Sequence, residues 1–208
     1  MASTTFTYTV LTGTKETEGS IKYWAQHSLI PAAQILEESQ AFVYQRLRVP
    51  EMITTATVTA ALNAEYMALP TLFLDPIGIR LYEDTDDLDY VHENLLKPDR
   101  DSAGALAAGR PTRWALIDNR IQFDVKCDAA ITGKITYFKT PAALAVTTNE
   151  TNWLTDRYPT LLRRACTAFA YESRHRMTDF QTEIVLVESA IDHANQSSDL
   201  ARRTQIMR

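Results

Sequence analysis

Histidine and cysteine are the residue types in this chain best suited to bind a metal ion or to carry out nucleophilic catalysis. None of the histidines stands four residues from another on one predicted helix, the spacing that lets two imidazoles share a metal. Each is therefore predicted to lie at the surface or to cap an element: His27, His92, His175 and His193.

The two cysteines are predicted to be core residues. Cys127 falls in a predicted strand, and Cys166 stands beside Ala165 near the apolar side of a predicted helix, where a thiol is usually inert. Pairing Cys166 with His175 or His193 as nucleophile and base also lacks an accompanying oxyanion-hole loop. We therefore expect no cysteine enzyme.

A cluster of acidic residues could bind a hard cation, but it lacks the spaced ligands and central glycine of a calcium loop. We interpret the cluster as the solvated start of a short surface helix over residues 84–97. The glycines form neither a dinucleotide fingerprint nor a phosphate loop, so we expect no cofactor, metal site or catalytic residue. The acids are Glu83, Asp84, Asp86, Asp87 and Asp89.

The composition is that of a folded soluble protein, with 45% hydrophobic and 23% charged residues among 208. A net charge of −5 argues against a protein that wraps nucleic-acid phosphates, and fits a protein partner or the wall of a channel that must not hold DNA. Because no apolar run approaches the length of a membrane span and the first ten residues are polar, we expect no membrane contact.

Two amphipathic helices are predicted near the C-terminus, joined at residues 177–178. Apolar residues recur at spacings of three and four in both, so an antiparallel hairpin is the simplest way to bury the two stripes. The stripes are Leu161, Leu162, Ala165, Phe169 and Ala170 in the first helix, and Phe180, Ile184, Val187, Ile191 and Ala194 in the second.

Aromatic and basic residues surround the first of these helices. Trp153 and Tyr158 precede it, where such residues either staple a helix to its core or contact another subunit. The basic residues lie off the apolar stripe, as a solvated face or as a surface that pairs with a neighbour's acids. They are Arg163, Arg164, Arg174 and Arg176.

The N-terminal part is predicted to be helical after a short arm. In the Thr-rich arm over residues 1–18, Phe6, Tyr8 and Val10 alternate as in a strand that pairs within its own subunit or with a neighbour's sheet. Ser20 is a plausible N-cap of a first helix, Pro31 could open a second, and that helix should end before residues 49–50.

The middle of the chain alternates with a period near two. Strands are predicted over residues 52–60, with residues 66–69 as hairpin partner, and over residues 77–82. Residues 113–117 and 120–125 flank Asp118 and Asn119, which suit a tight turn. A last strand over residues 130–138 has Gly133 as a candidate bulge, and residues 98–111 favour a mobile loop.

These elements predict an α+β protein: a discontinuous helical bundle formed by the N- and C-terminal helices, with an inserted antiparallel β-rich module. The predicted parts are the arm over residues 1–18, the helical domain over 19–49 and 151–196, the module over 50–150 and a tail over 197–208. The tail is either a frayed helix end or a segment that orders against a partner through Arg202, Arg203, Ile206, Met207 and Arg208.

The order of several segments resembles the head-to-tail adaptor proteins of tailed bacteriophages, over roughly residues 20 to 200. The resemblance rests on the strand ITYFKT followed by Pro141, on residues 152–154 (Asn-Trp-Leu) and on Tyr158-Pro159 opening an Ala-rich helix. Upstream, YMALP at residues 66–70 and RPTRW at 110–114 fall where the family has similar segments.

The resemblance implies a structural virion protein at the neck between capsid and tail. Such adaptors form a ring of about twelve copies beneath the portal protein, extend the DNA channel and dock the next neck or tail protein. The resemblance implies that DNA passes through without specific binding and that the tail lies in grooves between portal subunits. The alternatives are a tail-completion or stopper protein of the neck and, in a different class, a bacterial helical DNA-binding regulator.

Overall fold

The chain forms two compact units, one helical and one built of strands. The computed structural model describes residues 6–81, 87–96, 105–146 and 148–206, with side chains as far as Asp199. One unit consists of Met1–Met52 and Thr140–Arg208, and the other is the continuous segment Ile53–Lys139. The α+β class, with terminal helices and an inserted β module, is confirmed.

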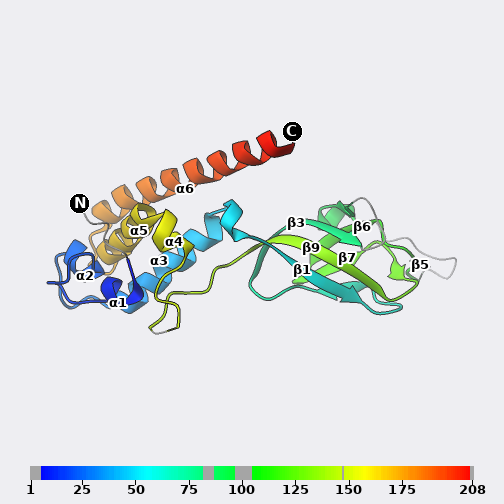
Figure 1. Cartoon of the computed structure of the whole chain (residues 1–208), viewed down its shortest axis with the longest axis horizontal. Helices are drawn as coiled ribbons and strands as arrows, with labels where there is room; N and C mark the ends of the chain where they lie inside the picture. The colour runs from blue at the N-terminus through cyan, green and yellow to red at the C-terminus, as the bar shows by residue number, and fades with distance from the viewer. Residues whose placement is uncertain (1–5, 82–86, 97–104, 147, 207–208) are drawn as a thin grey trace. The chain divides into compact units, whose positions relative to one another are not determined.

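In the helical unit, the predicted hairpin of long helices is confirmed. Helices α5 (Pro159–Glu172) and α6 (Met177–Ile206) pack side by side, and α3 (Ala32–Arg46) packs against α5 (Figure 1). Both apolar stripes supply buried residues, including Leu162 and Ala165 on α5 and Val187 and Ile191 on α6. Because these faces are buried against one another, the hairpin and α3 form one core.

The starts and ends of the shorter helices follow local capping chemistry. The Ser20 hydroxyl accepts a hydrogen bond from the backbone N–H of Tyr23 and caps α2 (Ile21–Trp24). Pro31 is the N-cap of α3, and α3 ends at Arg46, before Pro50, as predicted. Between α5 and α6, His175 adopts a positive φ of 56° in the turn that reverses the chain.

The strand predicted in the N-terminal arm is wrong. Thr7 instead caps a short helix, α1 (Tyr8–Leu11), by accepting a bond from the Val10 N–H. The Tyr8 N–H donates to the Glu150 carbonyl at 2.8 Å, and the Leu11 side chain is fully buried. The alternation of apolar residues was therefore produced by one helical turn and its flanks, not by a pleated strand.

The described residues of the strand unit form a three-stranded and a four-stranded sheet, with a further pair of short strands. The first has the order β1-β9-β3 and the second β2-β7-β6-β4, while β5 pairs with β8. The bounds are β1 (Ile53–Ala60), β2 (Tyr66–Ala68), β3 (Phe73–Leu81), β4 (Asp89–Tyr90), β5 (Ala108–Gly109), β6 (Arg113–Ile117), β7 (Arg120–Phe123), β8 (Lys126–Cys127) and β9 (Ile131–Lys139).

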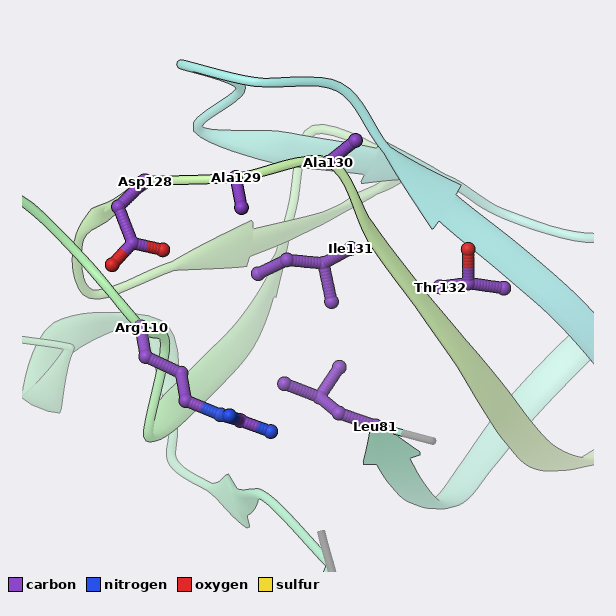
Figure 2. A pocket seen from close by; sticks show the side chains of 7 residues that line it. All are labelled: Leu81, Arg110, Asp128, Ala129, Ala130, Ile131 and Thr132. Carbon is purple, nitrogen blue, oxygen red and sulfur yellow. The ribbon is translucent and has the colours of Figure 1, made fainter. Parts of the chain in front are cut away.

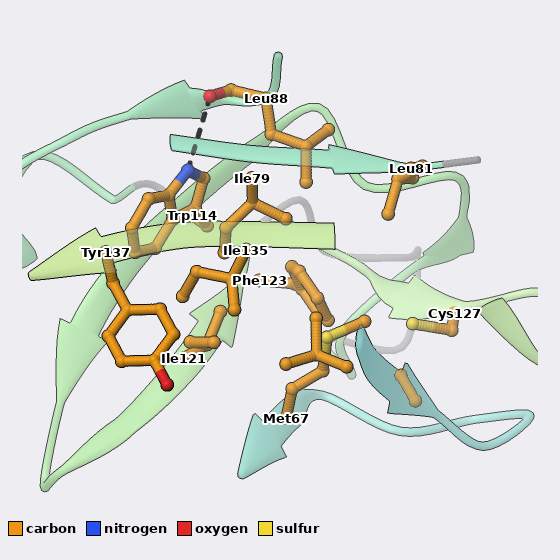
Figure 3. Close-up of a cluster of buried hydrophobic side chains, with 12 residues drawn as sticks. Met67, Ile79, Leu81, Leu88, Trp114, Ile121, Phe123, Cys127, Ile135 and Tyr137 are labelled. Carbon is orange, nitrogen blue, oxygen red and sulfur yellow. Dashed lines mark hydrogen bonds between the residues drawn. The ribbon is translucent and has the colours of Figure 1, made fainter. Parts of the chain in front are cut away.

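Side chains from both sheets form one core in this unit (Figure 3). Trp114 and Phe123 are its largest fully buried members, and Ile79 and Ile135 contribute from the other sheet. The Trp114 indole N–H donates to the Leu88 carbonyl at 3.2 Å, so its polar atom is satisfied inside the core. The strand unit therefore has a hydrophobic core of its own.

Three predictions within this unit need correction. Residues 66–68 form a strand, but it pairs with β7 and not with β1, which pairs with β9. The described residues of the predicted helix over 84–97 form β4 and a 3-10 turn, η2 (Glu93–Leu95). Gly133 lies in regular pairing, and the register shifts occur in β3 instead.

The need for a glycine at position 133 is steric. A Cβ there would lie 2.9 Å from the backbone oxygen of Arg80, closer than a carbon atom can approach. The predicted hairpin between β6 and β7 is confirmed, and both turn residues have positive φ, 49° at Asp118 and 58° at Asn119. Residues 98–104 of the predicted loop lie outside the described residues.

Candidate functional site

The aromatic residues before α5 are held within their own subunit. Trp153 opens α4 (Trp153–Arg157), and its ring lies 6.3 Å from that of Tyr44 and 6.0 Å from that of Tyr158. Both Trp153 and Tyr158 are half-buried. They therefore staple the start of the helical hairpin to α3, and only their exposed edges are free to contact another molecule.

Asn152 fixes this corner of the helical unit. Its side-chain oxygen accepts the N–H groups of Leu154 and Thr155, and its amide nitrogen donates to the Tyr44 hydroxyl at 2.7 Å. Burial raises the pKa of Tyr44 to about 12, although the bond from Asn152 acts in the opposite direction. Tyr44 is therefore a neutral structural group at physiological pH.

The four arginines of the predicted basic strip have different surroundings. Arg174 donates to the Ala25 carbonyl at 2.8 Å and so closes the end of α2. Arg164 approaches Glu183 on α6 at 3.5 Å, and Arg176 pairs with Asp179 at 2.6 Å. Arg163 is exposed on α5 and forms no ion pair with the described part of the chain. Of the four, Arg163 is thus the one whose charge is left for another molecule.

The exposed face of α6 is a candidate contact surface that was not predicted from the sequence. Val185 and Leu186 are 61% and 43% exposed, and Glu188 and Asp192 continue the same face toward the C-terminus. Neither acid forms an ion pair with a described residue. The available signal was that Val185 and Leu186 fall outside the apolar stripe of the helix, which left these large side chains without a place in the core.

A groove runs between α6 and the start of the helical hairpin. Its apolar lining includes Leu161 and Ala194, and its charged residues include Glu51, Arg157 and Arg164. Glu51 forms an ion pair with Arg157 through one carboxylate oxygen, while its other oxygen is buried without a hydrogen bond from the described residues. The groove therefore combines an apolar wall with an incompletely satisfied carboxylate.

The predicted tail residues belong to the last turns of α6 as far as the structure describes them. The helix continues through Arg202, Arg203 and Ile206, whereas Met207 and Arg208 lie outside the described residues. Ser198 is still buried, so the segment packed on the helical unit extends past residue 197. The predicted contacts of these residues with a partner stay a prediction.

In the strand unit, a pocket of about 280 Å³ lies between β3 and the start of β9 (Figure 2). Leu81 and Ile131 form its apolar part, and Arg110 and Asp128 supply its charges. Figure 2 shows the Arg110 guanidinium extending toward Leu81 and away from the Asp128 carboxylate. The polar groups do not converge on one point, as they do in a pocket that binds and orients a substrate.

The residue types that could do chemistry are used structurally. Both cysteines are buried, and burial raises the pKa of Cys166 to about 12. His92 caps η2, and the His27 ring accepts a hydrogen bond from the Leu29 N–H. Among the described residues there is no group of three or more His, Cys, Asp or Glu that could hold a metal. Nor is any described helix long and apolar enough to span a membrane.

Both units thus have a core of their own and carry exposed apolar side chains, such as Val185 and Leu186 in the helical unit and Tyr66 and Leu72 in the strand unit. The chain belongs to the SU10 adaptor protein family, whose model matches residues 17–207. It is therefore a phage structural adaptor, which is not an enzyme class, and it interacts with other proteins of the virion. No curated protein matches the sequence.

Proposed function

We propose that this protein forms a ring between the portal protein and the next neck or tail protein, extending the channel through which DNA passes. Family membership supports an adaptor role in the virion. The net charge of −5 suits a channel component that contacts DNA without holding it. From the resemblance to the head-to-tail adaptor proteins of tailed bacteriophages, we expect about twelve copies in a closed ring.

The observation that carries the ring proposal is a pair of complementary charged surfaces on different helices. Arg163 is exposed on α5 without an acidic partner, and Glu188 and Asp192 are exposed on α6 without a basic one, within the part of the chain that the structure describes. A contact between one subunit's α5 and its neighbour's α6 is heterologous, the type of contact that generates rings. Trp153, Tyr158, Arg164 and Arg174 make contacts within their own subunit, and we propose that their exposed parts add to the contact with the neighbour.

Charge reversal tests this contact. Arg163→Glu should reduce attachment to purified portal-bearing capsids about tenfold, because two like-charged surfaces then meet at every subunit boundary. The double variant Glu188→Arg/Asp192→Arg should also attach poorly to the capsids, for the same reason. An equimolar mixture of the two should attach again, since each variant's altered surface is complementary to the other's. Attachment is measured as copies per sedimented capsid on a stained gel.

The matched control is Glu37→Arg, which reverses an exposed acid on α3. It should attach as the natural chain does. Undiminished attachment of Arg163→Glu would reject the contact, and so would a mixture that attaches no better than its components.

We further propose that the end of α6 contacts the portal protein through Arg202, Arg203, Ile206, Met207 and Arg208. Three arginines offer charge-assisted hydrogen bonds, and two apolar side chains offer surface to bury. A single such segment binds weakly, but a ring presents many at once and so binds nearly irreversibly.

A truncation tests this second contact, and the structure sets where to cut. Because Ser198 is buried and Asn195 contacts the end of α3, the chain should be shortened after Asp199 and not before Ser197. The shortened protein should keep its helical circular dichroism and lose co-sedimentation with capsids. Normal co-sedimentation would exclude the proposed portal contact, and a lower melting temperature would show that the cut reaches the core.

A further inference from the structure

Strand β2 lies at one edge of the four-stranded sheet, with β7 as its only partner in that sheet. The Phe123 N–H donates to the Glu65 carbonyl at 2.9 Å, which makes Glu65 and Phe123 a hydrogen-bonded pair. Hydrogen-bonded and non-bonded pairs alternate in an antiparallel ladder, so the N–H and C=O groups of Tyr66 and Ala68 point away from β7. No described residue bonds to these groups, and both residues are exposed.

A groove of about 420 Å³ adjoins this edge, and we call it the Tyr66 groove. Its lining combines apolar side chains with the polar groups of Asn119 and Arg120 and is open to solvent, with Tyr66 and Leu72 each about half exposed. The residues that carry the argument are Tyr66, Leu69, Pro70, Leu72, Phe73 and Arg120. An apolar groove beside a free strand edge is the arrangement by which proteins bind an extended segment of a partner.

Leu72 is held toward solvent at an energetic cost. Its φ is +58°, in the left-handed region, where a residue other than glycine, asparagine or aspartate is an outlier. Burial offsets this cost only in part, because about half of Leu72 is exposed. A strained backbone that presents a large apolar side chain to solvent is common at sites of contact with other molecules.

Arg120 gives the groove a positive charge. Its guanidinium lies over the Tyr66 ring, 4.8 Å from the ring centre, which fixes the charge at the edge of β2. None of the residues lining the groove is acidic. A ligand that complements this surface therefore carries a carboxylate beside an apolar side chain.

We propose that the Tyr66 groove binds an extended, acidic and apolar segment of a different virion protein, which adds a strand to the free edge of β2. The backbone groups of Tyr66 and Ala68 bond to the added strand, an apolar side chain packs against Leu72, and a carboxylate pairs with Arg120. This contact uses the strand unit alone, so it is independent of the ring and of the portal contact proposed above.

The experiment places a photo-crosslinking amino acid at position 72 in the full chain, within assembled virions. We expect an adduct with another virion protein, joined within a segment that contains an acidic residue. The same crosslinker at exposed Lys134 on β9 is the control and should give no such adduct. Adducts only with a second copy of this chain would overturn the proposal, as would a yield no higher than that at Lys134.

Strand addition is tested with Ala68→Pro. The proline removes only the N–H that points away from β7, so the β2–β7 ladder should persist. This variant should abolish the adduct and retain the melting temperature of the natural chain. An undiminished adduct would overturn strand addition. If Ala68→Pro unfolds the unit, hydrogen exchange decides instead: the Tyr66 and Ala68 amides of the natural chain should exchange more slowly once the crosslinked segment is added as a synthetic peptide.

The role of Arg120 is tested with that same peptide. Arg120→Glu should weaken its binding about tenfold, whereas Arg113→Glu, an exposed arginine on β6, should leave binding unchanged. Equal effects of the two reversals would overturn the assignment of the carboxylate to Arg120. Because these measurements need no capsid, their failure is distinct from a failure of ring assembly.

Discussion

At the scale of single residues, the side chains that look most reactive in the sequence hold the fold together. Cys166 lies fully buried in the face of α5 that packs on the helical core, and Tyr44 is tied to Asn152. Burial raises the pKa of both groups to about 12, from 9.0 for the thiol and 10.0 for the phenol. Each is therefore kept in its neutral form by the surrounding apolar atoms.

These raised pKa values predict how stability depends on pH. An acid whose pKa is higher in the folded state ionises first in the unfolded chain, so its contribution is complete below the unfolded pKa and is lost as pH rises. The contribution of these two groups to the free energy of unfolding should be constant up to about pH 9 and then decline toward pH 12, by up to about 1.4 kcal/mol per pH unit for each group. The free energy of unfolding at each pH is measured by urea unfolding, with circular dichroism as the signal.

Cys166→Ala separates the thiol from the other groups. Ionisation of Tyr44 in the unfolded chain lowers the free energy of unfolding only above pH 10. Between pH 9 and 10, the free energy of unfolding of the variant should therefore fall less steeply with pH than that of the natural chain. Cys127, whose pKa burial also raises, leaves a residual slope. Identical slopes in the two proteins would contradict the assignment to Cys166, whatever the variant loses in overall stability from its smaller side chain.

At the scale of elements, the end of α3 depends on a residue far away in the sequence. The Asn195 side chain on α6 accepts the Arg48 N–H at 2.6 Å and donates to the Arg46 carbonyl at 3.0 Å. It thus satisfies the Arg46 carbonyl, an acceptor that the end of a helix leaves without an intrahelical partner, and the N–H of Arg48 just beyond the helix. The same contact fixes the position of α6 along α3.

Asn195→Ala should therefore destabilise the helical unit by about 1–3 kcal/mol, the cost of leaving such backbone groups without partners. Gln196→Ala, at the neighbouring exposed position of the same helix, should change stability by less than about 0.5 kcal/mol. The free energies of unfolding of the two variants are measured by urea unfolding. Similar losses in both variants would mean that helix propensity, and not the cap, is responsible.

Elements with local causes were predictable from the sequence. The apolar stripes of α5 and α6, the Ser20 cap and the turn at Asp118 and Asn119 depend on residues within a few positions of one another. The pairing of β2 was not predictable from the sequence, because its partner β7 lies more than fifty residues away and β1 is nearer in sequence. The strained φ of Leu72, on which the Tyr66 groove depends, leaves no signal in residue type.

At the scale of the whole molecule, the strand unit is inserted into the helical unit through two adjacent strands. Ile53 at the start of β1 pairs with Phe138 near the end of β9, so the two connections leave the strand unit side by side. The unit also has its own core around Trp114 and Phe123. Because the two ends of the insertion are adjacent and it has a separate core, the helical unit can contain it without a change in its own packing.

We therefore expect residues 53–139 to fold when expressed alone, and the helical unit to fold when a short glycine-rich linker replaces them. Paired Cα atoms in an antiparallel ladder lie about 5 Å apart, a gap that a few residues span. Dispersed amide resonances of the isolated strand unit and retained helical circular dichroism of the linked helical unit are the measurements. The paired variant Trp114→Ala should unfold the isolated strand unit, because it empties the core. A strand unit that stays unfolded without its helices would show instead that the helical unit supplies part of its stability, and the division into two separately stable cores would be wrong.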